Sequence, residues 1–286
     1  VLLAYHVLRM GPYFRFFAHA CTMIHKEGHF QRGLFKKSAG SLNRSMEWFV
    51  AFFYGHVPES YRIGHNRIHH AHGNNQQDVT STLDFDRSST WNYVLYLGQF
   101  VLYWSGVSVV HHFVGKGDYK SAFQMVRGMC VYYAVGCVLL LKDWRFGVGY
   151  YVVPFLETMV YLSAMNYAWH AFADENDSEN EYIKSLTILN GQYPVLNEDY
   201  HVVHHLKPSL HWSLVADEYE ATKDKYEANQ ATIFEHTHEF LIFVWILTRD
   251  FDALASHFVD LSGKLDYQQK YNLIVSRLQP AKTKVQ

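Results

Sequence analysis

The sequence His65-Asn-Arg-Ile-His69-His70 has a shorter counterpart, His201-Val-Val-His204-His205, and a simpler pair, His25-Lys-Glu-Gly-His29, precedes both. Side chains three and four residues apart lie on the same face of a helix, so each motif directs its imidazoles toward one point. Imidazole is the commonest metal ligand among protein side chains. The three motifs therefore predict one large metal site with nitrogen ligands, and we expect the rest of the chain to bring them together.

Histidine is the unusual residue in this 286-residue chain, with 19 copies. The net charge is -2, and no basic patch or nucleic-acid motif is present, so no nucleic-acid partner is expected. Three scattered cysteines are too few for a disulfide framework or a cysteine-type zinc site. The composition therefore favours chemistry based on histidine.

Long apolar segments separate the histidine motifs at 91–114, 122–141 and 146–169. The last two flank a short charged turn and predict a helical hairpin through a membrane, since a spanning helix needs about 20 residues. If one site uses both His70 and His170, an even number of crossings must separate them. We therefore assign 91–114, which is rich in Trp and Tyr, to the membrane interface.

The remaining segments are expected to lie outside the membrane core. Residues 46–57 and 239–250 are apolar but too short to cross a bilayer. Residues 213–229 are charged with helical spacing and predict a solvated surface helix. The chain begins at Val1 inside an apolar run, so we also expect a preceding segment, and we treat the chain as truncated at its N-terminus.

The number of histidines indicates more than one metal ion. The motifs supply eight imidazoles, whereas a tetrahedral zinc ion needs only four ligands. Two metal ions of higher coordination number fit better. Imidazole binds Zn, Cu, Fe and Ni, so the ligand type leaves the metal open.

The order and spacing of the motifs resemble those of the membrane fatty-acid desaturase superfamily, integral-membrane enzymes with three histidine boxes and a di-iron centre. The resemblance runs from about residue 20 to about residue 230. The second box, at 65–70, has three intervening residues where acyl desaturases usually have two. The third box is similar to that of acyl desaturases, including the Leu-Lys-Pro and the charged helix that follow it.

The resemblance also implies a ninth ligand and a supporting asparagine. Several members have a histidine at the end of a transmembrane helix, preceded four residues earlier by an asparagine that contacts an iron through water. Asn166 and His170 occupy these places. The implied metal ligands are His25, His29, His65, His69, His70, His170, His201, His204 and His205. Metal-bound histidines usually donate their second N–H to a carboxylate or carbonyl, and the candidate carboxylates are Asp78, Asp174, Glu198 and Asp199.

Other histidines have simpler interpretations. His111 and His112 end an apolar segment without a third partner and are expected at the interface. His236 and His238 are two residues apart, a spacing that splays them on a helix. His56, His72 and His211 lie near the boxes and are candidates for supporting groups around the metal.

The fold implied by the resemblance is all-α. It is an integral membrane helical bundle with a cytosolic-side helical cap that carries a histidine-rich di-metal site. We expect a single domain over residues 1–286, in which 231–286 form a peripheral helical tail. The expected location is the endoplasmic reticulum membrane in a eukaryote or the inner membrane in a bacterium.

The implied activity is oxygen-dependent oxidation of a fatty acyl or lipid substrate at two iron ions, with O2 as co-substrate. Removal of two hydrogens gives a double bond, and the alternative is hydroxylation. Desaturation is favoured by the third box. Hydroxylation is favoured by the wider second box and by Asn166-Tyr-Ala-Trp-His170, both of which are similar to alkane hydroxylases.

The sequence has no cytochrome b5-like heme motif, flavin fingerprint or four-cysteine iron–sulfur pattern, so a separate donor of cytochrome b5 or ferredoxin type is expected. A different class, a membrane protein that binds or transports zinc or copper, is also consistent with many histidines. A transporter should place ionisable ligands inside its spans, whereas eight of these histidines lie outside the apolar segments. This placement favours an enzyme, and the complete ligand set argues against an inactive relative that serves as a scaffold.

Overall fold

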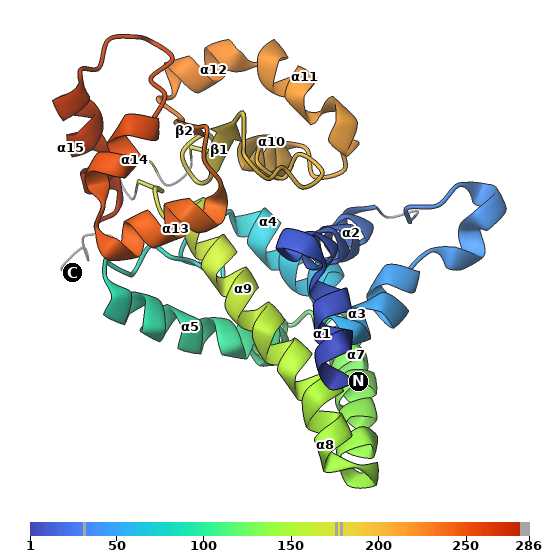
Figure 1. Ribbon diagram of the computed structural model, residues 1–286. Helices are drawn as coiled ribbons and strands as arrows, with labels where there is room; N and C mark the ends of the chain where they lie inside the picture. The colour runs from blue at the N-terminus through green and yellow to red at the C-terminus, as the bar shows by residue number, and fades with distance from the viewer. Residues whose placement is uncertain (31–32, 175–176, 178–179, 281–286) are drawn as a thin grey trace. The chain divides into compact units, whose positions relative to one another are not determined.

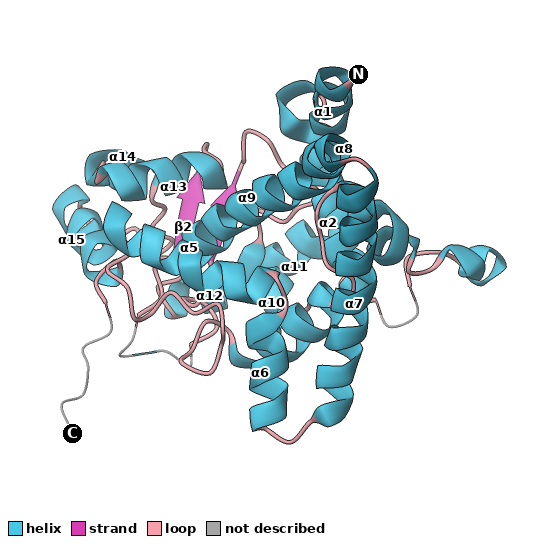
Figure 2. Ribbon diagram, turned by 90° about the horizontal axis from the view of Figure 1, so that it is seen from below, coloured by secondary structure: helices cyan, strands magenta, loops and turns pink. Residues whose placement is uncertain are grey.

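The computed structural model describes residues 1–30, 33–174, 177 and 180–280. The chain forms two compact units. Unit 1 comprises Val1–Ala71 and Phe100–Leu162, and unit 2 comprises His72–Gln99 and Ser163–Gln286. Helices dominate the described chain, as Figure 2 shows, which confirms the predicted helical fold.

Unit 1 begins with two helices, α1 (Leu2–Met10) and α2 (Arg15–His29), and α2 carries the first histidine box at its C-terminal end (Figure 1). Gly11 ends α1 with a φ of 68°, and a 3-10 turn, η1 (Pro12–Phe14), follows. Because proline is restricted to the first turn of a helix, Pro12 separates the two helices. The short elements η2 (Lys37–Leu42), η3 (Met46–Val50) and α3 (Ala51–Phe53) come next.

Among the residues that the structure describes, two helices are long and apolar enough to cross a membrane. The first is α7 (Tyr119–Lys142). The second runs from Trp144 to His170 through α8 (Trp144–Gly147), η5 (Val148–Val152) and α9 (Val153–His170). In Figure 1, α7 and α8 lie side by side. This pair confirms the predicted apolar hairpin.

The tight turn of this hairpin depends on Asp143. Its side chain accepts hydrogen bonds from the backbone N–H groups of Arg145 and Phe146 and so caps the second helix. A Cβ at Gly136 would overlap the ring of Tyr151, so this ring packs directly on the backbone of α7.

Residues 91–114 do not form one straight helix. They form α5 (Thr90–Trp104) and α6 (Val107–Gly115), which meet at an angle of 73°. The break contains Gly106, whose φ of 91° is a conformation that glycine adopts without steric cost. Taken together, the bent pair is also long and apolar enough, by length and composition, for a broken span or a re-entrant loop.

Unit 2 contains a two-stranded parallel sheet that the sequence did not predict. Strand β1 (Leu186–Leu189) pairs with β2 (Thr232–Glu235), with Leu186 opposite Thr232. The third histidine box forms α10 (His201–Leu206), which packs against β1.

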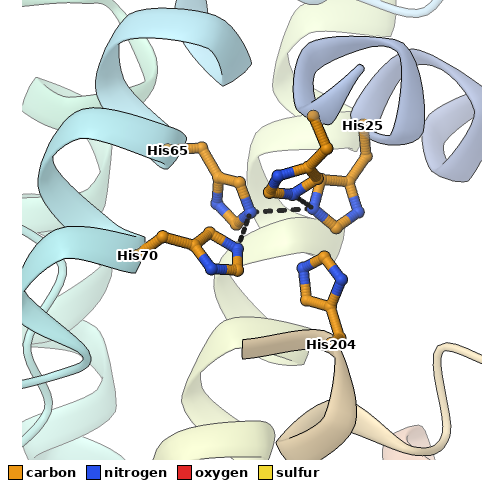
Figure 3. Close-up of side chains that lie close together, drawn as sticks. His25, His65, His70 and His204 are labelled. Carbon is orange, nitrogen blue, oxygen red and sulfur yellow. Dashed lines mark hydrogen bonds between the residues drawn. The ribbon is translucent and has the colours of Figure 1, made fainter. Parts of the chain in front are cut away.

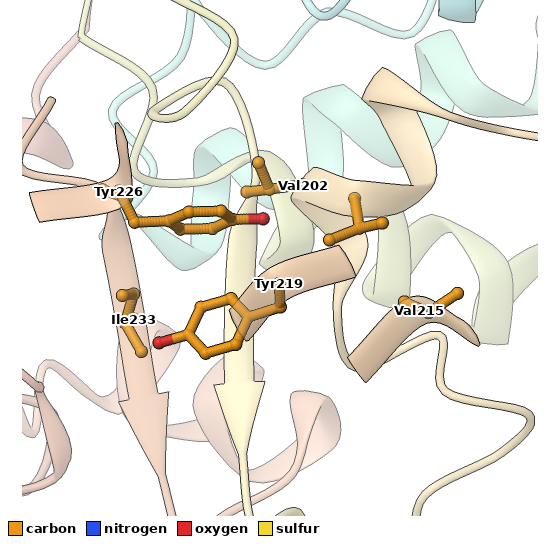
Figure 4. Close-up of a cluster of buried hydrophobic side chains, with 7 residues drawn as sticks. Val202, Val215, Tyr219, Tyr226 and Ile233 are labelled. Carbon is orange, nitrogen blue, oxygen red and sulfur yellow. The ribbon is translucent and has the colours of Figure 1, made fainter. Parts of the chain in front are cut away.

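The charged segment 213–229 is more buried than predicted. It forms η7 (Trp212–Leu214), α11 (Val215–Ala221) and α12 (Lys223–Ala228). Val215, Tyr219 and Tyr226 are buried in an apolar cluster with Val202 and Ile233, which Figure 4 shows. Only one side of this segment is solvated, and the other side supports α10.

The C-terminal part of unit 2 consists of α13 (Glu239–Thr248), α14 (Phe251–His257) and α15 (Tyr267–Arg277). The apolar helix α13 has 10 residues, as short as the sequence predicted. A capping box formed by Asp266 and Gln269 begins α15.

A buried arginine connects three segments of unit 2: the loop at residues 83–87, the residues that follow α9, and the end of α15. Arg87 is 1% exposed, and its guanidinium donates hydrogen bonds to backbone carbonyls at distances from 2.6 to 3.2 Å. The acceptors are the carbonyl oxygens of Leu83, Phe85, Ala171, Ala173 and Arg277. Two of them belong to the residues just after His170, so Arg87 fixes the chain at the end of α9.

We expect Arg87→Met to lower the free energy of unfolding by about 3 kcal/mol or more, because several buried carbonyls lose their donor. Denaturant unfolding of the purified protein in detergent measures the change. Lys264→Met, which removes an exposed cation from the same unit, is the control and should shift stability by less than about 0.5 kcal/mol. Equal stability of the two variants would contradict this role.

Candidate metal centre

Four histidines of the first two boxes converge in unit 1. The Nε2 atom of His25 lies 2.7 Å from that of His65 and 2.9 Å from that of His29, and the Nε2 atoms of His65 and His70 are 3.0 Å apart. Figure 3 shows the imidazoles of His25, His65 and His70 pointing toward one another. One ring nitrogen from each of the four residues lies within 4.8 Å of the others.

The second box achieves this convergence through a π-helix. It lies in η4 (Ser60–His69), followed by α4 (His70–His72). In a regular α-helix His65 would share a face with His69, four residues later. The wider π turn instead brings His65 together with His70, five residues later. The prediction that every box follows α-helical spacing was therefore wrong for this box.

The distances suit a bound metal ion. Imidazole nitrogens lie about 2.0–2.1 Å from zinc, so neighbouring ligands are about 2.8–3.0 Å apart in octahedral geometry and about 3.3–3.4 Å apart in tetrahedral geometry. The observed Nε2 separations of 2.7–3.0 Å are close to the octahedral range. Burial, followed by neighbouring histidines, holds the pKa of His29 and His65 well below the ordinary value of 6.5. Both imidazoles are neutral, which is the form that binds metals.

A second set of histidines lies in unit 2. One ring nitrogen each of His170, His201 and His205 lies within 4.8 Å of the others. His201 and His205 are on one face of α10, with ring centroids 4.9 Å apart. Trp169 stacks on His201 at 4.2 Å and fixes the plane of its ring.

His170 is oriented by the backbone. Its Nδ1–H donates to the carbonyl oxygen of Lys184 at 2.7 Å, which leaves Nε2 as the atom that can bind a metal. The carbonyl oxygen of His170 itself accepts hydrogen bonds from Thr82 and Asn74. Sequence reasoning missed these supports, because a backbone carbonyl leaves no signal in the residue types.

His69 and His204 complete the nine predicted ligands. Each is the chain neighbour of a clustered histidine, and each is at most 2% exposed. The ring of His69 stacks on that of His65 at 5.0 Å, and the ring of His204 lies 5.2 Å from that of His201. His69 therefore lies beside the histidine set of unit 1, and His204 lies beside the histidine set of unit 2.

The carboxylates suggested as supports are mostly buried. Asp78 accepts hydrogen bonds from the backbone of Asn74 and from Thr80, so it shapes the loop after the second box. Glu198 and Asp199 shortly precede the third box, and burial, followed by Glu198, raises the pKa of Asp199 to about 6. Asp174 is partly buried and acts electrostatically on Arg277.

Asn166 lies one helical turn before His170 in α9. Its side-chain amide donates to the hydroxyl of Tyr96 at 2.7 Å and to the carbonyl of Thr80 at 3.4 Å. The amide nitrogen of Asn166 is thus held by residues of unit 2. The contact of Asn166 with a metal through water stays a prediction.

Glu27, between the two histidines of the first box, is directed to the backbone. Its two carboxylate oxygens accept hydrogen bonds from the backbone N–H groups of Arg44 and Glu47 at 2.7 and 2.8 Å. Sequence reasoning assigned no role to this residue, although its place inside the box was a visible signal.

His56 lies beside the first set. It is fully buried, with ring centroids 4.9 Å from Trp104 and 5.5 Å from Tyr61, and Tyr61 in turn contacts His25 at 5.1 Å. Among the residues that the structure describes, neither ring nitrogen of His56 has a hydrogen-bond partner. Burial lowers the pKa of His56 to about 3, so its ring is neutral.

The model of the fatty acid desaturase family matches residues 2–237, which is most of the chain and includes all nine histidines. No curated protein and no solved structure shows significant similarity to the chain.

We expect His70→Ala to weaken metal binding by on the order of a hundredfold or more, because it removes one of four converging nitrogens; loss of an outer-shell partner alone typically costs 10–100-fold. Mass spectrometry of metals bound to the purified protein measures the effect. His111→Ala, an exposed histidine of unit 1, is the control and should keep the metal content of the unaltered protein. Equal metal content in both variants would remove His70 from the site.

We expect His56→Phe to make the protein more resistant to acid. The folded pKa of about 3 lies below the ordinary value of 6.5, so below pH 6.5 the unfolded chain takes up a proton that the folded chain does not. The unaltered protein therefore loses about 1.4 kcal/mol per pH unit from this group, and the variant does not. Unfolding at pH 7 and pH 5 measures the difference, with His111→Phe as the control. A stability difference between variant and unaltered protein that stays constant with pH would contradict the assignment.

Proposed function

Because the chain belongs to the fatty acid desaturase family, we propose that it is an oxygen-dependent membrane oxidoreductase that introduces a double bond into a fatty acyl chain. The observation that carries the proposal is the convergence of the Nε2 atoms of His25, His29, His65 and His70. Four nitrogens at this separation, two of them in rings whose pKa burial lowers, form a donor set for a metal ion.

We propose that the nine histidines together hold two iron ions. Imidazole suits iron, and the all-nitrogen donor set of each unit fits such an ion. When bound, the iron pair would supply the activation of O2 that removal of hydrogen from an unactivated carbon requires. Zinc with the same ligands would supply no redox chemistry.

The chain's own residues prepare these ligands in two ways. In unit 1, burial holds the pKa of His29 and His65 well below the ordinary value of 6.5 and so favours their neutral form. In unit 2, the carbonyl of Lys184 holds the Nδ1 proton of His170 and so keeps Nε2 as the ligand atom. Both effects lower the cost of forming the metal site, because the ligands need no rearrangement or deprotonation.

The apolar helices support a lipid substrate and a place in the membrane. Val131, Val135 and Val138 are exposed along one face of α7, where they would contact lipid tails. A fatty acyl chain is soluble in the same phase. We propose a multi-pass protein of the endoplasmic reticulum or bacterial inner membrane, supplied with electrons by a separate donor of cytochrome b5 or ferredoxin type.

Hydroxylation of an alkyl or acyl chain is the second candidate. The observation that favours it is the wider second box, whose extra residue is accommodated by the π turn between His65 and His70. The two reactions share the removal of the first hydrogen and differ in the second step, which is removal of another hydrogen or addition of a hydroxyl group. Their products therefore distinguish them better than any ligand does.

We expect the chain, expressed in a host with a suitable electron donor, to produce a lipid that lacks two hydrogens of its precursor. Lipid profiling by mass spectrometry measures this, and a product with one added oxygen would instead show hydroxylation. His204→Ala should abolish the product while the protein remains in the membrane.

The control is His236→Asn in the same unit, because His236 is exposed and asparagine tolerates its φ of 55°. Full turnover by His204→Ala would remove the third box from the site. Stoichiometric zinc without iron in the purified protein would overturn the oxidoreductase proposal.

A further inference from the structure

Glu59 occupies an unfavourable position at the start of the second-box helix. It is fully buried, precedes η4 and has a left-handed φ of 72°. Glycine and asparagine adopt this conformation more readily than glutamate does. A strained, buried glutamate at this turn indicates a requirement for its carboxylate.

The carboxylate of Glu59 lies between two arginines. Its Oε1 atom is 3.0 Å from a guanidinium nitrogen of Arg44 and also forms an ion pair with Arg127. The backbone N–H of Glu59 donates to the carboxylate of Glu47 at 2.7 Å. Glu47 in turn accepts two hydrogen bonds from the guanidinium of Arg44.

This network continues to the first box through Glu27, whose carboxylate accepts the backbone N–H groups of Arg44 and Glu47. Glu27 lies between His25 and His29 in α2. Glu59, at the other end of the network, immediately precedes the helix of the second box. The charged network thus joins the two helices whose histidines converge.

The apolar helix α7 joins the same network. Arg127 belongs to α7, and a Cβ at the next residue, Gly128, would overlap the carbonyl oxygen of Pro58. The backbone of α7 therefore approaches the residue before Glu59. The guanidiniums of Arg44 and Arg127 also lie 5.5 and 5.2 Å from the ring centroid of Trp48.

We propose that Glu59 is a positioning residue that sets the second histidine box against the first, so that His65 and His70 meet His25. This inference rests on the proposed function, in which these histidines hold a metal. Removal of its charge would leave two guanidiniums without a shared anion and release the start of η4. The effect should reach the metal through the histidines, since Glu59 is not among the converging ligands.

The test separates this role from that of an ordinary buried ion pair. Unit 1 also contains the ion pair of Arg9 with Glu157, in which Arg9 is 5% exposed and contacts Tyr5, Phe17 and Tyr54, while the side chain of Glu157 is 34% exposed. Glu157→Gln is therefore the matched control for Glu59→Gln. Both variants remove one carboxylate charge from an ion pair of the same unit.

The measurement is titration of the purified, metal-free protein with Co²⁺, in competition with a chelator. The visible absorption of bound Co²⁺ reports its coordination geometry. Glu59→Gln should weaken Co²⁺ binding about tenfold or more, as loss of a ligand-orienting group typically does, and change the spectrum. Glu157→Gln should leave the spectrum unchanged and the affinity within about twofold, even where it lowers the unfolding temperature.

Two further variants are needed. One tests the ion pair if Glu59→Gln misfolds, and the other separates the loss of charge from the strain of the left-handed turn. Arg127→Gln acts through a half-exposed side chain and should shift the spectrum in the same direction as Glu59→Gln, with a smaller loss of affinity. Glu59→Asn relieves the left-handed strain and should still lose Co²⁺ affinity. Normal Co²⁺ binding by Glu59→Asn, or equal weakening by Glu59→Gln and Glu157→Gln, overturns the inference. Failure of the unaltered protein to bind Co²⁺ overturns the proposed function and the inference with it.

Discussion

Imidazoles that share one metal ion must be brought within about 3 Å of each other while they stay neutral, and the architecture of unit 1 follows from this constraint. Burial satisfies the second condition, since desolvation disfavours the charged form of His29 and His65. The first condition requires that α2 and η4 be held at a fixed position relative to each other. The carboxylates of Glu27, Glu47 and Glu59, with Arg44 and Arg127, bridge the two helices beside an apolar cluster of Ile24, Ala51 and Tyr61.

The helical fold and the apolar hairpin were predictable, because both depend on the local pattern of residues. About twenty apolar residues on either side of a short charged turn leave few alternatives to a pair of long helices. The β1–β2 pair was not predictable, since its strands have four residues each and lie far apart in the sequence. The burial of Tyr219 and Tyr226 was missed because the charges around them indicated a solvated helix.

The candidate site was predictable in its residue types and less so in its geometry. Histidine spacing indicated that the boxes converge, and within each unit the histidines do so. The π register of the second box depends on backbone hydrogen bonds that no residue type specifies. The carbonyl of Lys184 and the arginine bonds of Glu59 are similarly set by tertiary structure.

The π turn in η4 bears on how such a box can change during evolution. A π turn holds one residue more than an α turn, so deletion of a single codon between His65 and His70 would convert one into the other. After the deletion the helix would continue along the same axis, and the two histidines would be four residues apart on one α-helical face. Boxes of different length can thus present the same pair of ligands, and histidine spacing alone is a weak marker of ancestry.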